Sequence, residues 1–460
     1  MKQGYKPTRS IEVRCWNEKV GALALDPETG FYAFQYYPDF AQRGLQIAPL
    51  TMPLDPARVF IFPNLPVATF SRLPSCIADS LPDAFGNALI DSWMAAHGVQ
   101  RDRVSVLDRL AYLGNRAMGA LEFVPPLQQG EPVPSALQMN ELVAQARRAT
   151  TVDLHGDSPQ AAAHVKTSLS AEAYPELSQL IAVGTSAGGA RAKAVVGYNP
   201  SADRFISGQF ELPEGYRHWL IKFDTADVDN TGHDPEYGRV EYAYATMARD
   251  CGILMSPCQL YEAAGRAHFM TQRFDRVTGG PGAPVVEEGE APPASGKLHI
   301  QTLCAMAELD FNQVGTHDYS QLFLTIERLG LGYQAIDQAF TRMVFNVCMA
   351  NCDDHTKNHS LMMDAQGQWR LAPAYDLTHA YRADSYWVSR HLMSVNGRFA
   401  SITAADLLQV ARRFNVSDPI GIIQNIRAVA AHWPDYAKAA GASAATTRRV
   451  RGDIEYFSGL

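Results

Sequence analysis

The sequence of 460 residues contains no run of eighteen apolar residues, so a membrane-spanning helix is not expected. Its first residues, MKQGYKPTRSIEVRCW, lack the apolar stretch of a secretory signal. The seven cysteines show no paired spacing, and an odd number does not suit a disulfide framework. These absences predict a cytoplasmic protein with no membrane partner.

An excess of basic residues is also absent. Lys and Arg number 40 against 48 Asp and Glu, which gives a formal net charge of -8. The whole molecule is therefore not expected to bind nucleic acid through its charge. One basic cluster, TTRRVRGD at residues 446–453, is interpreted as a solvated helix face. The length predicts two or three domains or lobes, and 47% hydrophobic residues suffice for their cores.

The most informative stretch is FNVCMANCDDHTKNHSLMM, from Phe345 to Met363, in which a dense polar patch lies between two apolar runs. Burying so many polar groups without partners costs several kcal/mol, so the patch is either a surface turn or a working site. Asp353 and Asn358 have the D-x-x-x-x-N spacing of a kinase catalytic loop. In that loop the Asp accepts the proton of the substrate hydroxyl and the Asn holds a metal ion.

The residues that follow predict a hairpin, with strands at 360–363 and 369–372 joined by a turn at 364–367. Such a hairpin would bring Asp376 back beside Asn358. A carboxylate and an amide oxygen suit Mg²⁺, which is bound by few protein groups together with phosphates. The alternative is a polar loop that caps a hairpin, with Asp376 as a turn residue.

A loop of small residues, Gly184 to Ala190, precedes Arg191, Lys193 and a predicted strand at 194–198. Glycines let backbone N–H groups approach phosphate oxygens, although the Walker A pattern does not match here. By itself the loop is better interpreted as a flexible turn, and the phosphate-binding interpretation depends on the residues that follow. The next predicted strand, HWLIKFD, carries a single Lys222 in an apolar run, where a lysine needs a partner.

A helix that begins near residue 238 supplies Glu241, which would pair with Lys222 as in a kinase or would remain a surface residue. The segment HFMTQRFDRV, residues 268–277, is then the candidate hinge. Gln272 and Phe274 would contact the nucleotide there through their backbone groups.

The order of these parts predicts an α+β, two-lobed protein-kinase-like fold, with a β-rich N-terminal subdomain and a mostly helical C-terminal lobe. Residues 1–150 are predicted to form the N-terminal subdomain, strands first and helices after, which we interpret as a scaffold. The other predicted parts are an N-lobe nucleotide-binding part at 151–277, a flexible Pro/Gly/Glu-rich insertion at 278–297 and the helical C-lobe at 298–460.

With these motifs, the chain resembles the HipA family of bacterial serine/threonine kinases, the toxins of HipBA-type toxin–antitoxin modules. LQIAPLTMPL, DSLPDAFGNALID and GNRAMGALEF resemble N-terminal segments of that family, and GTSAGGARAKA resembles its phosphate loop. FNVCMANCDDHTKNHS and PAYDL resemble its catalytic and metal motifs. The resemblance covers nearly the whole chain.

The resemblance implies ATP and Mg²⁺ as cofactors, Asp353 as the catalytic base, and Asn358 and Asp376 as metal ligands. It further implies that a Ser in the small-residue loop, Ser186 or its neighbour Thr185, is autophosphorylated and that this inactivates the kinase. The implied nucleotide-binding residues are Ala187, Gly188, Gly189, Ala190, Arg191, Lys193, Lys222, Gln272, Phe274, His355, Lys357, Asn358 and Asp376.

The implied activity is transfer of phosphate to a protein of the translation machinery, such as an aminoacyl-tRNA synthetase. The implied partner is a helix-turn-helix antitoxin similar to HipB, and DNA through it. Two other functions stay open from the sequence. One is a small-molecule phosphotransferase, and the other is a nucleotide-binding regulator that acts through a DNA-bound partner.

Overall fold

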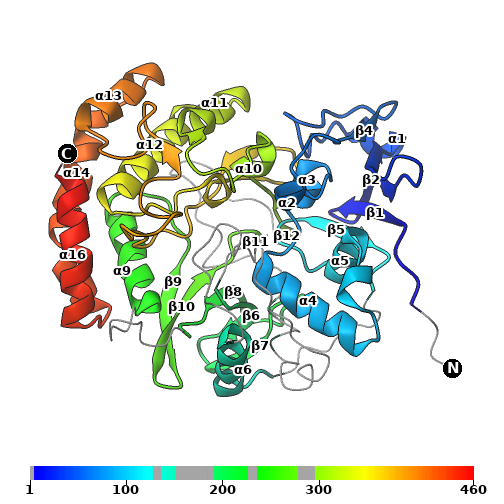
Figure 1. Cartoon of the computed structure of the whole chain (residues 1–460), viewed down its shortest axis with the longest axis horizontal. Coiled ribbons are helices and arrows are strands. Elements are labelled where there is room, and N and C mark those ends of the chain that lie inside the picture. Colours follow the sequence, from blue (N-terminus) through cyan, green and yellow to red (C-terminus); the bar gives the residue numbers. More distant parts are fainter. Residues whose placement is uncertain are drawn as a thin grey trace.

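The computed structural model of the chain describes residues 5–127, 136–151, 180, 184, 191–225, 236–277 and 296–459. Figure 1 shows the N-terminal sheet on the side of the molecule opposite to the C-terminal helices, with a second sheet in the lower centre of the view. The chain thus starts in a β-rich region, passes through a sheet that carries Lys222, and ends in a mostly helical lobe.

The N-terminal sheet has five antiparallel strands in the order β4-β3-β2-β1-β5. Inward and outward positions alternate along β1, so that Ile11, Val13 and Cys15 are buried, as expected for a sheet with one solvated face. The strands are β1 (Ser10–Cys15), β2 (Glu18–Leu25), β3 (Tyr32–Tyr36), β4 (Val59–Ile61) and β5 (Leu121–Val124).

Helices lie between the later strands of this sheet and after its last strand, β5. The Asp83 carboxylate caps helix α4 by accepting a hydrogen bond from the Gly86 amide at 2.9 Å. The helices here are α1 (Pro38–Arg43), α2 (Val67–Phe70), α3 (Ser75–Ala78), α4 (Ala84–Ala96), η1 (Arg101–Arg103), α5 (Val106–Leu113) and α6 (Met139–Thr151).

The second sheet is also antiparallel, in the order β7-β6-β8-β10-β9. Helix α9 (Tyr237–Asp250) packs on β9 and β10, while α4 and α6 share a hydrophobic core with β6, β8 and β10. The strands are β6 (Lys193–Asn199), β7 (Arg204–Ser207), β8 (Arg217–Lys222), β9 (Cys258–Ala263) and β10 (Arg266–Gln272).

The C-terminal lobe contains the predicted hairpin. Strands β15 and β16 pair antiparallel, and β13 lies on the other side of β15. The lobe consists of β13 (His299–Thr302), α10 (Leu303–Met306), β14 (His317–Asp318), α11 (Ser320–Arg328), α12 (Tyr333–Cys348), η4 (Thr356–Asn358), β15 (Ser360–Met363), β16 (Trp369–Leu371), β17 (Met393–Ser394), α13 (Ala404–Arg413), α14 (Pro419–Ala431), α15 (Trp433–Ala439) and α16 (Ala444–Ser458).

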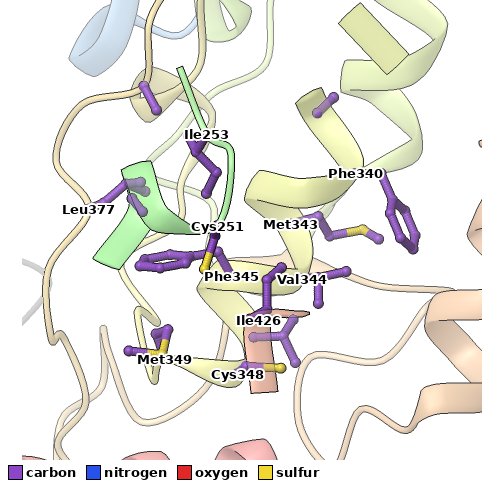
Figure 2. Close-up of a cluster of buried hydrophobic side chains, with 14 of the residues drawn as sticks. Cys251, Ile253, Phe340, Met343, Val344, Phe345, Cys348, Met349, Leu377 and Ile426 are labelled. Carbon is purple, nitrogen blue, oxygen red and sulfur yellow. The ribbon is translucent and has the colours of Figure 1, made fainter. Parts of the chain in front are cut away.

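Helix α12 lies at the centre of the largest hydrophobic core, which Figure 2 shows in close-up. Apolar side chains recur along α12 at helical spacing, as in Phe340, Val344 and Cys348, and α11, α14 and α16 pack around it. Leu377 reaches the same core from the segment after β16. The core therefore fixes both the helix that leads into the polar patch and the residue that follows Asp376.

These features confirm the predicted α+β architecture with its β-rich start, its hairpin and its helical end. The predicted insertion at 278–297 is described only from Gly296 onward. Gly296 and Lys297 form β12, which pairs with β11 (Arg276–Val277), so these last two residues belong to a small sheet and not to a flexible segment. In the described parts of the chain, we find no helix with the length and apolar character needed to span a bilayer.

The N-terminal region is attached to the segment after β10 and to the C-terminal lobe by buried polar contacts. The Asp275 carboxylate accepts a hydrogen bond from the Gly119 amide at 2.8 Å, and the Arg276 guanidinium donates to the carbonyls of Gly119 and Ala117. At a second point the buried His299 ring contacts the carbonyl of Ile47 at 2.9 Å through Nε2. Since a carbonyl only accepts, Nε2 carries the proton and Nδ1 does not.

His299 makes this attachment sensitive to pH. Burial lowers the pKa of His299 to about 4, and its Nδ1 has no hydrogen-bond partner among the described residues. The unfolded chain therefore binds one proton more than the folded chain between pH ~6.5 and ~4. The free energy of unfolding therefore decreases as the pH falls through this range. For this one group the decrease is at most ~1.4 kcal/mol per pH unit.

The variant His299→Gln keeps a side-chain donor and cannot titrate. We expect its free energy of unfolding to decrease less between pH 7 and pH 5 than that of the parent. Urea denaturation at a series of pH values measures this decrease for the parent and the variant. His432→Gln, in which an exposed imidazole is removed, is the control for the loss of a histidine. A decrease with the same slope in His299→Gln and in the parent would contradict the assignment.

Candidate active site

The polar patch begins where helix α12 ends. The last turn closes with a hydrogen bond from the Met349 amide to the Phe345 carbonyl, and Tyr244 donates to the Met349 carbonyl at 2.8 Å. Ala350 then takes a left-handed conformation with φ 51°, which turns the chain away from the helix axis. The Asn351 amide group donates to Asn346 Oδ1 at 2.8 Å, so the turn is fastened back onto α12.

The buried Asp354 fixes the next part of the loop. Its carboxylate accepts hydrogen bonds from the Tyr319 hydroxyl at 2.9 Å, from His391 Nδ1 at 2.9 Å and from the Leu392 amide at 2.7 Å. Asn346 in turn donates to the Tyr319 hydroxyl at 2.9 Å. A buried carboxylate that accepts three hydrogen bonds is held firmly in place, and it sets the direction of the neighbouring residue, Asp353.

Asp353 points toward solvent, with 40% of its side chain exposed. The Asn358 side chain donates to the Asp353 carbonyl at 2.8 Å, which closes the loop between the two residues. The pKa of Asp353 is raised overall, mainly by burial, and the nearby His355 and the indole of Trp387 offset part of this rise. The result is an accessible carboxylate on a rigid loop, which is what a general base requires.

Lys222, at the end of β8, joins three parts of the molecule. Its Nζ lies 2.5 Å from Glu241 Oε1 on α9 and also forms an ion pair with the Asp376 carboxylate. Burial opposes the charged form of Lys222, but Asp376 and Glu241 outweigh this and raise its pKa. The predicted contact with Glu241 is present, whereas a role of either residue in nucleotide binding stays a prediction.

Asp376 follows β16 and has a left-handed backbone, with φ 53°, which Asp and Asn tolerate better than most residues. The next residue, Leu377, is buried in the core around α12, so the backbone here is held on one side. Burial raises the pKa of Asp376, but Lys222 and Lys193 outweigh it, and the pKa is lowered overall. Asp376 is therefore ionised at neutral pH.

Lys193, the first residue of β6, is buried close to this group. Its Nζ lies 3.7 Å from Asp83 Oδ2, and Asp376 also favours its charged form, although burial lowers its pKa overall. Burial raises the pKa of Asp83 to about 6, against the effect of Lys193. The N-terminal region, predicted to be a scaffold, thus contributes a carboxylate to the site.

The predicted hinge lies at the end of β10. The Gln272 amide donates to the Pro257 carbonyl at 2.8 Å, so the predicted backbone contact would have to use the Gln272 carbonyl. The Phe274 ring stacks on Tyr375 with 6.0 Å between centroids, and the Tyr375 hydroxyl donates to the Lys357 carbonyl at 2.6 Å. These contacts join the end of β10 to the catalytic loop.

The other predicted nucleotide-binding residues are distributed as follows. Arg191 stacks over the Tyr237 ring at 3.6 Å, and Lys357 Nζ lies 4.7 Å from the centre of the Phe311 ring. His355 Nε2 lies 3.7 Å from Asp353 Oδ1. The predictions for Thr185, Ser186, Ala187, Gly188, Gly189 and Ala190 fall outside the described residues.

The groups present fit a magnesium ion held jointly with phosphate. Asp376 offers an ionised carboxylate, and Asn358 keeps its amide oxygen because its amide nitrogen donates to Asp353. Within the described ranges, no cluster of three or more His, Cys, Asp or Glu residues could hold a metal alone. Mg²⁺ is commonly bound by one or two side chains together with substrate phosphates.

Sequence reasoning missed three side chains that contribute to the site. Asp83 Oδ2 lies 3.7 Å from Lys193 Nζ, Trp387 donates to Asp353 Oδ1 at 2.6 Å, and Phe311 lies against His355 with 5.4 Å between ring centroids. The D-x-x-x-x-N spacing is a local signal, whereas these three residues reach the site through tertiary contacts. For Asp83, the DSLPDAFGNALID segment that carries the resemblance was the available signal.

Comparison with known proteins agrees with this geometry. The family model described as the HipA-like C-terminal domain matches residues 185–434, which is more than half of the chain. The model described as the HipA N-terminal domain matches residues 11–124. A search of curated proteins finds no match to this chain.

Among solved structures, the chain is similar to the HipA toxin of Shewanella oneidensis MR-1 in its complex with HipB and operator DNA. The TM-score is 0.64 at 17% identity, over 98% of each chain, so the overall fold is shared. The Helicobacter pylori proinflammatory kinase CtkA is a remote match, with a TM-score of 0.34 at 11% identity over 53% of this chain and 87% of its own.

The two family models together match most of the chain, and its overall fold is shared with a HipA. The chain belongs to the HipA family. The resemblance found in the sequence motifs is thereby confirmed.

The first test of the site concerns the buried ion pair. We expect Glu241→Gln to lower the free energy of unfolding by about 1–3 kcal/mol. The loss is smaller than for a buried lysine left without any partner, because Asp376 still pairs with Lys222. Urea denaturation measures this change.

Glu262→Gln is the matched control. Glu262 also lies next to a basic side chain, Arg239 at 2.8 Å, but 71% of its side chain is exposed. Exposed pairs of this kind contribute about 0–1 kcal/mol. Equal destabilisation by the two substitutions would contradict a special role for the buried pair.

Proposed function

We propose that the protein is an ATP- and Mg²⁺-dependent serine/threonine protein kinase and the toxin of a toxin–antitoxin module. The observation that carries this proposal is the exposed Asp353 carboxylate on a rigid loop, in one site with Lys222 and Asp376. A solvent-facing base can receive a hydroxyl from a large acceptor, and the lysine–carboxylate group suits a nucleotide phosphate with its metal.

In this mechanism, Asp353 orients the acceptor hydroxyl and takes its proton as the oxygen attacks in line. Lys222 and Lys193 hold the phosphate chain and offset its charge, and Glu241 keeps Lys222 directed into the site. Asp376 and Asn358 would hold the Mg²⁺ that bound ATP brings, and the ion would offset the charge that develops as the γ-phosphoryl group is transferred and ADP leaves. The contribution of the chain is thus positioning and charge stabilisation.

For ATP to bind, the site must accept a nucleotide together with its metal and waters, and three buried polar atoms lack, within the described ranges, partners that such a group could supply. Buried polar atoms without a hydrogen-bond partner among the described residues occur at Asp83 Oδ2, Asn351 Oδ1 and His355 Nδ1. Buried polar atoms in folded proteins are nearly always satisfied. A bound nucleotide with its metal and waters would provide partners for such atoms.

The proposed acceptor is a serine or threonine of a component of translation, such as an aminoacyl-tRNA synthetase. The proposed partner is a HipB-like helix-turn-helix antitoxin, through which the protein would be held at DNA. Support for the partner comes from the similarity to a HipA that was solved together with HipB and operator DNA. Autophosphorylation at Ser186 or Thr185 belongs to the same proposal and concerns residues outside the described ranges.

The central test of the function is Asp353→Asn. We expect phosphoryl transfer to fall at least 100-fold, while ATP affinity stays within about threefold, since the base acts only in the reaction. The measurement is incorporation of label from γ-labelled ATP into protein bands of a cell lysate, alongside nucleotide binding by calorimetry.

Asp435→Asn is the control, because Asp435 is 79% exposed and is paired with His432 at the surface. Activity of Asp353→Asn within a few-fold of the parent would contradict its role as the base. Label that enters only small molecules would favour a small-molecule phosphotransferase instead.

A second test concerns the metal. We expect Asp376→Asn, which suits the left-handed backbone and removes the charge, to abolish most of the increase in ATP affinity that Mg²⁺ produces. ATP titrations with Mg²⁺ and with excess chelator, on the parent and the variant, measure this increase. Equal affinities with and without Mg²⁺ in the parent would exclude the proposed metal site.

A further inference from the structure

Trp387 makes a contact that none of the motifs explains. Its indole Nε1–H donates a hydrogen bond to Asp353 Oδ1 at 2.6 Å, and the two residues are 34 positions apart in the sequence. Trp387 lies in the loop between Asp376 and β17, and its side chain is half-buried. The contact therefore connects the candidate base to a loop that is distant from it in the sequence.

The loop that carries Trp387 is held by its own hydrogen bonds. The amides of Trp387 and Val388 donate to the Ser385 hydroxyl at 3.1 and 3.2 Å. The Ser385 amide donates to the Arg382 carbonyl at 3.0 Å, and the Arg382 amide donates to the Val388 carbonyl at 3.3 Å. These bonds fix the backbone from which the indole projects.

The indole is also held by neighbouring rings. It lies edge-on to His355 at 6.2 Å and to Phe311 at 6.5 Å between centroids. Phe311 is itself anchored from the N-terminal region, because Thr69 is hydrogen-bonded to both of its neighbours, to the Asp310 carboxylate and to the Asn312 side chain. Edge-to-face contacts of this kind have preferred geometries, so the ring has little freedom to turn.

An indole N–H can only donate a hydrogen bond, and it cannot take up or release a proton at ordinary pH. A donor fixed on Oδ1 sets the plane of the Asp353 carboxylate and leaves Oδ2 to accept the substrate hydroxyl. His355 lies on the same side, 3.7 Å from Oδ1. Trp387 and His355 thus both lie next to Oδ1 of the base.

We propose that Trp387 is a positioning residue for phosphoryl transfer, which holds the Asp353 carboxylate in the orientation that presents Oδ2 to the acceptor hydroxyl. This inference rests on the proposed kinase function. It assigns the Trp387 loop to the chemical step and not to nucleotide binding.

Trp387→Phe removes the donor and keeps an aromatic ring. We expect kcat to fall about 10- to 100-fold, since a small misplacement of a reacting group has an effect of this order. The KM for ATP should stay within about twofold. The assay follows phosphate transfer from γ-labelled ATP to a degenerate serine/threonine peptide library.

Trp387→His retains a ring N–H donor at this position and should recover part of the lost kcat, which a purely structural role would not predict. Ser385→Ala is a second route to the same test, because it loosens the loop without touching Asp353, and we expect a smaller loss of kcat. Trp369→Phe is the matched control, as the Trp369 indole donates to the Gln46 carbonyl at 3.3 Å, and its activity should equal that of the parent.

An active parent whose kcat is unchanged by both Trp387→Phe and Ser385→Ala would overturn this inference alone. A rise in kcat in Trp387→Phe would also overturn it, because the indole would then be blocking the base. A parent that transfers no phosphate to any peptide or lysate protein would overturn the proposed function and this inference together.

Discussion

The site depends on one ion-pair group, in which Lys222 is held between Glu241 and Asp376. The three side chains come from a strand of the second sheet, from helix α9 and from the segment after the C-terminal hairpin. A buried lysine is stable only with such partners, because removing its charge from water is costly. The pairing therefore requires the two lobes to approach each other closely, and that approach defines the site between them.

Much of this arrangement follows from local patterns in the sequence. The alternation in SIEVRC, the turn between β15 and β16 and the apolar spacing in α12 each act over a few residues, so they can be predicted without knowledge of the tertiary structure. The spacing of Asp353 and Asn358 is also a local pattern. In the structure, the Asn358 side chain donates a hydrogen bond to the Asp353 carbonyl. Lys222 could be singled out because a lysine within an apolar strand needs a partner.

What could not be predicted depends on contacts between distant segments. Asp83 is a helix cap by its local sequence, and only the packing of α4 on the second sheet brings it to Lys193. Trp387 lies in a loop without periodicity, and nothing in its neighbourhood along the chain indicates a contact with Asp353. The roles of the nucleotide-binding and metal-binding residues remain predictions, since they concern groups that bind from solution.

The two functions of Asp83 have a consequence for how this chain can vary. One carboxylate oxygen stabilises the first turn of α4, and the other lies beside Lys193. Serine, threonine or asparagine would preserve the helix cap, yet each would leave Lys193 with one countercharge fewer. Positions 83 and 193 are therefore energetically coupled, and a neutral residue at one is compatible only with a compensating change at the other. The surface at which the N-terminal region meets the second sheet is constrained by electrostatics as well as by shape.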